Sequence, residues 1–309
     1  MSRSSSKGRG PWLGSPLSAG LTIGRDQLGY VELGRSGQKW GLRRATQAPI
    51  ESRLFVGDAS VPTGVAALVL AIRAALDGQP PSFGPLHVSV PDAAVRWSLF
   101  ELDALPGSRA AQDAFVKFRM ERDLGEAKCR YTSQALGRGS GGKQWLLGLA
   151  LEEGWHQVVE DALRQTGLRA WSLSANTFRR FNLHHPRITT HSGALVTLEP
   201  DTWSLAIWDA GGLLRYLRSQ WRADDLDERE IALEIERSIL GYAHGESGRT
   251  VEQIWVCAGL GTPELISLLN ARTHRACEVL EFTDALDEAA PPLPDFPARA
   301  AALAAALQA

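Results

Sequence analysis

Short apolar runs separated by turn residues open the chain and predict a group of strands. Residues 21–23, 29–33 and 39–43 form three such runs, with Gly, Asp and Ser between them, as expected for tight hairpins. Further on, Val65, Leu68, Ile72 and Leu76 recur at spacings of three and four residues, which predicts one amphipathic helix. The opening pattern is therefore a three-strand meander followed by a helix.

A second pattern predicts an insert of the form β-β-α-β-β-α. In its first helix we expect Phe115 and Phe118 to face inward, and after its second helix a strand and a short helix lead to a joint at Pro186. The expected strands are 87–90, 95–102, 129–134, 144–151 and 168–173, and the expected helices are 111–124, 155–163 and 175–181.

The opening pattern then recurs and predicts a duplicated α/β fold. The second copy has expected strands at 195–198, 204–208, 213–219, 251–257 and 277–280, a long helix around Ile231–Tyr242 and a shorter one at 263–269. Two such copies form a cleft in which a ligand is expected. The expected division is a disordered tail at 1–16, a first subdomain at 17–84 and 168–188, an inserted subdomain at 85–167, and a second subdomain at 189–309 ending in an Ala-rich helix.

Composition narrows the function classes. The 309 residues carry a formal net charge of −2 and three widely spaced cysteines, which predicts no nucleic-acid partner and a reducing compartment. No apolar run reaches the ~18 residues of a membrane span, so we expect no transmembrane segment. Weak contact with an anionic membrane surface stays open as an alternative, because the Ser/Gly-rich tail carries Arg3, Lys7 and Arg9.

Three strand–turn stretches carry the candidate chemistry: Gly20–Gly24, Ala194–Glu199 and Ile254–Gly261. Backbone N–H groups of such turns can hold phosphate. Together the stretches resemble the nucleotide cradle of an actin-type ATPase, in which Asp is usual at the positions of Thr22 and Thr197.

A nucleotide in such a cradle would lie against eight residues, and no catalytic or metal-ligating residue is predicted. Glu199 stands where the second turn usually has Gly, and its charge would repel phosphate. Asp26 and Asp201 are the acids that could replace the missing carboxylates. The eight candidate cofactor-binding residues are Gly24, Arg25, Asp26, Asp201, Thr202, Gly259, Leu260 and Gly261.

Two further motifs are interpreted as structural. Residues 137–143 match the spacing of a phosphate-binding loop, but Gln144 follows instead of Ser or Thr, and a strand is expected where that loop requires a helix. We interpret this segment as a hairpin tip. His184 and His185 lack partners at metal-ligand spacing, and we expect both in a surface loop.

With these pieces in order, the chain resembles the PilM family, actin-like proteins of type IV pilus assembly that are related in fold to the cell-division protein FtsA. The resemblance covers the chain from about Leu17 onward. It rests on Gly20–Gly24 with Leu28–Leu33, Val88–Asp92, Glu234–Ser238, and Ala258-Gly259 with Thr262-Pro263. The fold class implied is a duplicated actin-like (ribonuclease H-like) fold.

The resemblance implies a cytoplasmic adaptor that is peripheral to the inner membrane and belongs to a pilus assembly platform. Its implied partners are the short N-terminal peptide of a PilN-like membrane protein, in a groove between the first subdomain and the insert, and other platform or motor components. With Thr22, Thr197 and Glu199 in the cradle, we expect a pseudo-ATPase.

Three alternatives stay open at this point. The first is an active switch of the same fold that binds ATP and magnesium. The second is a GspL-like component of type II secretion. The third is a sugar or acetate kinase, for which the chain offers no evident catalytic Asp.

Overall fold

The computed structural model describes residues 17–24, 26–36, 39–50, 64–79, 85–125, 128–139, 142–199, 202–210, 212–221, 227–245, 250–258 and 262–280. Its strands are β1 (Leu17–Ile23), β2 (Gln27–Ser36), β3 (Lys39–Pro49), β4 (Leu86–Val90), β5 (Val95–Leu102), β6 (Cys129–Arg138), β7 (Gln144–Glu152), β8 (Ala170–Ala175), β9 (Gly193–Leu198), β10 (Thr202–Trp208), β11 (Leu214–Trp221), β12 (Gln253–Ala258) and β13 (Ala276–Val279). Its helices are α1 (Val65–Leu76), the short 3-10 helix η1 (Asp92–Ala94), α2 (Arg109–Leu124), α3 (Glu153–Gln165), α4 (Asn176–Ile188), α5 (Glu228–Gly245) and α6 (Thr262–Thr273).

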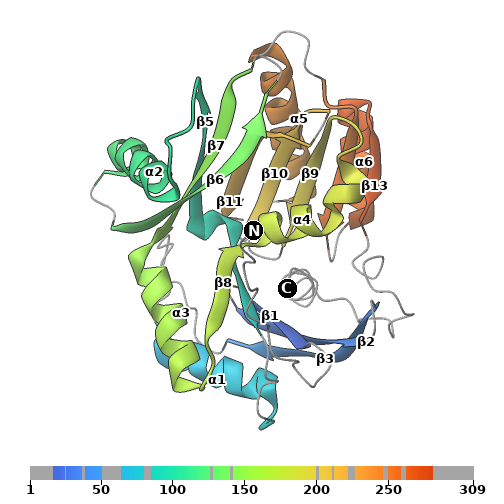
Figure 1. The fold of residues 1–309 in the computed structure, drawn as a ribbon. Coiled ribbons are helices and arrows are strands. Elements are labelled where there is room, and N and C mark those ends of the chain that lie inside the picture. Colours follow the sequence, from blue (N-terminus) through green and yellow to red (C-terminus); the bar gives the residue numbers. More distant parts are fainter. Residues whose placement is uncertain are drawn as a thin grey trace, which may run out of the picture.

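Two five-stranded sheets share one topology, which confirms the expected duplication. The first has the order β3-β2-β1-β4-β8 and the second the order β11-β10-β9-β12-β13 (Figure 1). In each sheet an antiparallel meander continues into two parallel strands. Thr22 lies opposite Ser89 in the first sheet, and Thr197 lies opposite Cys257 in the second. The two threonines therefore occupy equivalent positions in the two halves.

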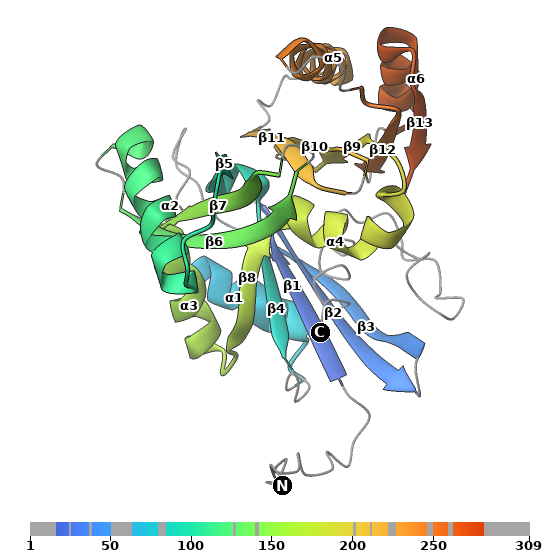
Figure 2. The same cartoon turned by 45° about the horizontal axis from the view of Figure 1, so that its top comes forward.

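Helices cover the outer face of each sheet. The stripe predicted from Val65 to Leu76 is α1, whose Leu68 and Ile72 are buried in the core of the first sheet. The helix ends where Asp77 and Gly78 take left-handed backbone angles, with φ of 46° and 66°. In the second half, α5 and α6 cover the equivalent face (Figure 2).

The insert has its own sheet of order β5-β7-β6, covered by α2. The two end elements of the expected insert lie elsewhere. Strand β4 is a central parallel strand of the first sheet, and α3 packs into the first core through Trp155. A fully buried strand such as β4 is typical of a parallel sheet with both faces covered.

Two expectations about helices need correction. Phe115 packs against the insert core as expected, whereas Phe118 is 75% exposed, and the fully buried residues of α2 are Val116 and Met120. The second correction concerns the helix after β8, which continues past Pro186 to Ile188 as α4 and places His184 and His185 on a helix instead of a loop. Of these two side chains, His184 is buried and His185 is exposed.

Helix α4 lies between the two large sheets (Figures 1 and 2). Its Phe181 and Ile188 pack on the second sheet against Trp208 and Cys257. Its Arg179 donates a hydrogen bond to Ser172 of β8 in the first sheet, at 2.5 Å. The helix is therefore shared by both halves.

The expected tail at 1–16 and the expected Ala-rich terminal helix lie outside the described residues. Among the helices that the structure does describe, none combines the length and the apolar character that crossing a bilayer requires.

Candidate functional site

The first two turns of the cradle use their backbone groups within the turns themselves. The N–H of Gly24 donates to the carbonyl of Gln27 at 2.8 Å, and the N–H of Glu199 donates to the carbonyl of Thr202 at 2.8 Å. Asp26 is exposed, and Thr202 is fully buried. Of the other candidate residues, Arg25, Asp201, Gly259, Leu260 and Gly261 lie outside the described residues.

The two threonines that stand at the usual Asp positions are buried. Thr22 and Thr197 are 2% and 1% exposed, and neither hydroxyl has a hydrogen-bond partner among the described residues. A neutral hydroxyl at these positions supplies no charge to a metal or its waters. These side chains therefore cannot take over the role of an aspartate.

A buried ion pair occupies the second turn. Glu199 Oε1 accepts from Arg180 Nη2 at 2.6 Å, with side chains 7% and 1% exposed. Glu199 Oε2 accepts from Asn176 Nδ2 at 2.7 Å and from the Thr202 hydroxyl at 3.4 Å. Arg180 Nη1 also donates to the carbonyl of Cys257 on β12, at 3.3 Å. Both carboxylate oxygens are thus engaged by α4 and by the turn.

A second buried carboxylate lies where β4 ends. Asp92 is 0% exposed and accepts from the Thr177 N–H at 2.8 Å and from the hydroxyls of Thr177 and Ser204 at 2.6 Å each. Its carbonyl accepts from the Ser219 hydroxyl at 3.3 Å. Burial raises the pKa of Asp92, whereas these hydrogen bonds act against the rise. The carboxyl group joins α4 and β10 to the end of the first sheet.

Next to the insert lies an apolar groove that could hold a ligand. Its cavity of about 160 Å³ lies between β4 and β8 of the first half and β6 and β7 of the insert. The walls are mainly aliphatic, with a minority of polar side chains. The lining residues are Val90, Val95, Arg130, Tyr131, Thr132, Leu149, Leu151, His156, Leu173, Ser174 and Ala175.

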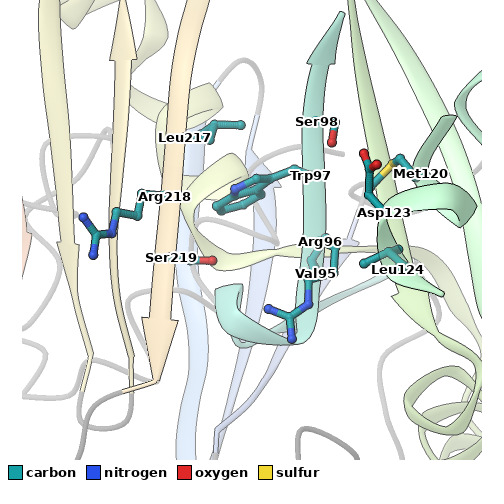
Figure 3. A pocket seen from close by; sticks show the side chains of 10 residues that line it. All are labelled: Val95, Arg96, Trp97, Ser98, Met120, Asp123, Leu124, Leu217, Arg218 and Ser219. Atoms are coloured by element: carbon teal, nitrogen blue, oxygen red, sulfur yellow. The ribbon is translucent and has the colours of Figure 1, made fainter. Parts of the chain in front are cut away.

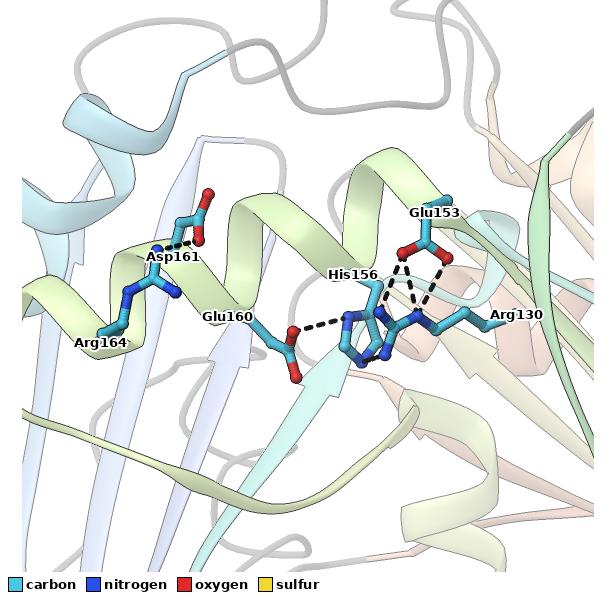
Figure 4. A network of polar contacts seen from close by, with 6 residues as sticks. All are labelled: Arg130, Glu153, His156, Glu160, Asp161 and Arg164. Carbon is cyan, nitrogen blue, oxygen red and sulfur yellow. Dashed lines mark hydrogen bonds and ion pairs between the residues drawn. The ribbon is translucent and has the colours of Figure 1, made fainter.

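A charged network holds two of these polar residues, Arg130 and His156, in place (Figure 4). Arg130 donates to both oxygens of Glu153 at 2.9–3.0 Å and lies 3.0 Å from His156 Nε2. The other ring nitrogen of His156 lies 3.3 Å from Glu160. The hydrogen bonds from Arg130 lower the pKa of Glu153, and burial raises the pKa of Tyr131 to about 12.

A second hollow, of about 320 Å³, lies between β5 and α2 of the insert and β11 of the second half. Figure 3 shows Trp97 on the β11 side of β5, with Arg218 pointing away from the hollow. Arg218 is held by Glu234 at 2.7 Å and Ser238 at 3.1 Å on α5. The hollow therefore has mixed walls and does not bring together groups of one chemistry.

The paired sheets of equal topology, with a helix between them and an insert in the first half, define the class of protein, an actin-like α/β protein. Among solved structures, the chain is similar to a chain of the PilM-PilN type IV pilus biogenesis complex, with 19% identity, a TM-score of 0.77 and coverage of 94% of this chain and 98% of that one. This likeness confirms the PilM-like fold expected from the sequence.

Two further structures show the same fold. A Bacteroides thetaiotaomicron protein of actin-like ATPase fold and unknown function is 6% identical, with a TM-score of 0.54 and coverage of 86% and 91%. The ethanolamine utilization protein EutJ from Carboxydothermus hydrogenoformans is 10% identical, with a TM-score of 0.51 and coverage of 96% and 91%. No protein-family model matches the chain, and no curated protein matches it.

The actin-like fold implies a magnesium nucleotide, and the described part of the cradle does not fit one. A buried anionic Glu199 stands at the second phosphate turn, and its partner Arg180 lies beside it. The two strand positions that should carry acids hold hydroxyls. No group of three or more His, Cys, Asp or Glu side chains that could hold a metal occurs among the described residues.

Sequence reasoning noted Glu199 but missed its partners. Arg180 and Asn176 lie on α4, about twenty residues earlier, and no local pattern links them to the turn. Asp92 was assigned only to a family-like strand, although a buried Asp directly after an apolar strand requires hydrogen-bond donors. That requirement is the signal that could have marked it.

Proposed function

We propose that this protein is a non-catalytic adaptor of a membrane-bound assembly platform of the type IV pilus kind. In this proposal it binds the short cytoplasmic N-terminal peptide of a PilN-like membrane protein. It acts at the cytoplasmic face of the inner membrane through that partner. The observation that carries the proposal is the apolar groove between the first half and the insert.

The chemistry of the groove supports a peptide ligand. Leu149, Leu151 and Leu173 offer aliphatic contact, and a cavity of about 160 Å³ suits the insertion of one or two apolar side chains. Strands β6 and β8 lie at the edges of their sheets, so that an extended segment has backbone groups to pair with. Arg130 and His156 add polar groups to its lining.

The similarity to a chain of a PilM-PilN complex supports this choice of partner. The resemblance found in the sequence leads to the same class of peptide. The Glu199–Arg180 ion pair and the two buried threonines support an adaptor role without hydrolysis. An ATP-driven switch of the same fold is the second candidate, and the same experiment tests it.

The test is calorimetry on the full chain with a synthetic N-terminal peptide of a PilN-like protein, with and without Mg-ATP. We expect peptide binding that does not require nucleotide, and no heat from Mg-ATP alone. Thr132→Trp places a bulky ring at the groove, since Thr132 is an exposed lining residue, and should weaken peptide binding by about tenfold, equal to 1.4 kcal/mol.

Ala135→Trp is the matched control, because Ala135 is exposed on the same strand and does not line the groove. It should bind the peptide as the unmodified protein does. Equal binding by both variants would remove the groove from the proposal. If Mg-ATP binds saturably and the peptide binds only in its presence, the ATP-driven switch is favoured instead.

A further inference from the structure

We propose that buried charged side chains on and around α4 hold the two halves of this protein in one fixed orientation, taking the structural place of a ligand bound between them. This inference goes beyond the adaptor role and does not depend on it. It rests on two carboxylates, Asp92 and Glu199, and on one guanidinium, that of Arg180.

The first connection runs from α4 to two of the three stretches of the cradle. Arg180 bonds Glu199 at the second turn at 2.6 Å and the carbonyl of Cys257 at the end of β12 at 3.3 Å. A positive charge that joins several strand ends is what a bound cation would supply in this position. Here a side chain of the protein itself provides it.

The second connection runs from the first half to the second. Asp92 directly follows Pro91 at the end of β4, and its carboxylate accepts from Thr177 on α4 and from Ser204 on β10. The Ser219 hydroxyl on β11 donates to the carbonyl of the same residue. Asp92, a residue of the first half, thus contacts the connecting helix α4 and two strands of the second half, β10 and β11.

A movement of the two halves away from each other would separate these groups. If β10 moved away from Asp92, a fully buried carboxylate would lose the Ser204 hydroxyl, and a buried anion without its donors is strongly disfavoured. If α4 moved away from the second turn, the buried Arg180 and Glu199 would lose their 2.6 Å ion pair, and breaking a buried pair is strongly destabilising. Both costs oppose a hinge motion, with or without nucleotide.

Distances between spin labels on the two halves test the proposal in the full chain. Leu70 on α1 and Leu240 on α5 are 59% and 49% exposed and suit replacement by labelled cysteine, with Cys129 and Cys277 changed to Ser. The label distance should be narrowly distributed and unchanged by Mg-ATP. Glu199→Gln and Ser204→Ala should each at least double the width of the distribution.

Glu236→Gln is the control, because Glu236 pairs with Arg272 at 3.1 Å entirely within the second half. It should leave the distribution unchanged. Ser204→Ala removes a single hydroxyl, so this variant keeps the test open if Glu199→Gln does not fold. Folded variants with a distribution as narrow as that of the parent protein would overturn the proposal, and so would a parent distribution that shifts with Mg-ATP.

Discussion

His87 makes the stability of the folded protein depend on pH. Its ring is 4% exposed on β4, with Nδ1 2.7 Å from the Ser172 hydroxyl. Burial, followed by the nearby Arg179 charge, lowers the pKa of His87 from 6.5 to about 4. The folded protein therefore keeps this ring neutral under conditions in which the unfolded chain would protonate it.

The sign of the effect follows from proton linkage. As the pH falls from 6.5 towards 4, the unfolded state binds a proton that the folded state does not, so the free energy of unfolding decreases. At about 1.4 kcal/mol per pKa unit the loss approaches about 3 kcal/mol. Burial also shifts the pKa of Asp92, in that case upwards, so the His87 contribution has to be isolated by a variant.

His87→Asn removes the titrating ring and keeps an oxygen near the position of Nδ1. In this variant we expect the free energy of unfolding to fall much less between pH 6.5 and 4 than in the parent protein. Urea denaturation across that pH range measures the difference. His185→Asn, at an exposed ring on α4, should keep the full pH dependence. An unchanged slope in His87→Asn would assign the acid sensitivity to other groups.

At the level of single residues, the sequence showed which positions lack the usual aspartates, but it did not show which buried side chains contact each other. Thr22 and Thr197 could be identified because a strand–turn pattern fixes their place. The pairing of Arg180 with Glu199 and of Asp92 with Ser204 could not, because these partners are 19 and 112 residues apart. The contact of the eight candidate residues with a nucleotide stays a prediction.

At the level of elements, the strands were predicted well because turn residues bound them. Helix α4 was predicted too short, because Pro186 was interpreted as a joint after a helix at 175–181. The packing of Phe181 and Ile188 on the second sheet stabilises a longer helix. The inward face of α2 was predicted correctly at Phe115 and wrongly at Phe118. A three-stranded sheet buries only a narrow stripe of that helix, which is formed by Val116 and Met120 with Phe115 beside them.

The insert depends on one close contact between its helix and its sheet. Gly148 lies in the middle of β7, where an added Cβ would be 2.8 Å from Val116 Cγ1 and 2.9 Å from Phe100 Cε2. Gly148→Ala should therefore overpack this core and lower the free energy of unfolding by about 1–3 kcal/mol. Guanidinium denaturation followed by circular dichroism measures this change.

Gly241→Ala provides a control of opposite sign. Gly241 is an exposed residue of α5 with no atom within 4 Å of an added Cβ, and Ala favours a helix over Gly by about 1 kcal/mol. We expect this variant to be more stable than the parent protein. A Gly148→Ala variant as stable as the parent would show that α2 can shift away from β7 at little cost.

At the level of the whole molecule, the duplication was predictable and the attachment of the insert was not. Repeated patterns in the sequence define the two sheets, but the contacts between the insert and the second half join residues that are far apart in the sequence. Leu99 and Leu136 of the insert pack against the second half, and a cation–π contact adds to them. Arg215 of β11 is held by Asp209 at 2.6 Å, and its guanidinium lies 4.4 Å from the centre of the Trp145 ring on β7. This contact links the insert to the half of the molecule that does not line the apolar groove.

We expect this contact to affect peptide binding from a distance, because β7 contributes both Trp145 and the groove residues Leu149 and Leu151. Arg215→Gln removes a cation–π contact of about 0.5–2 kcal/mol, so hydrogen exchange should become faster in β5–β7 and peptide affinity should fall several-fold. Arg218→Gln is the control, since Arg218 makes the same kinds of contact with Glu234 and Trp203 within the second half and should leave affinity unchanged. If hydrogen exchange in the insert of Arg215→Gln becomes faster while peptide affinity is unchanged, the groove keeps its shape without the contact between Arg215 and Trp145.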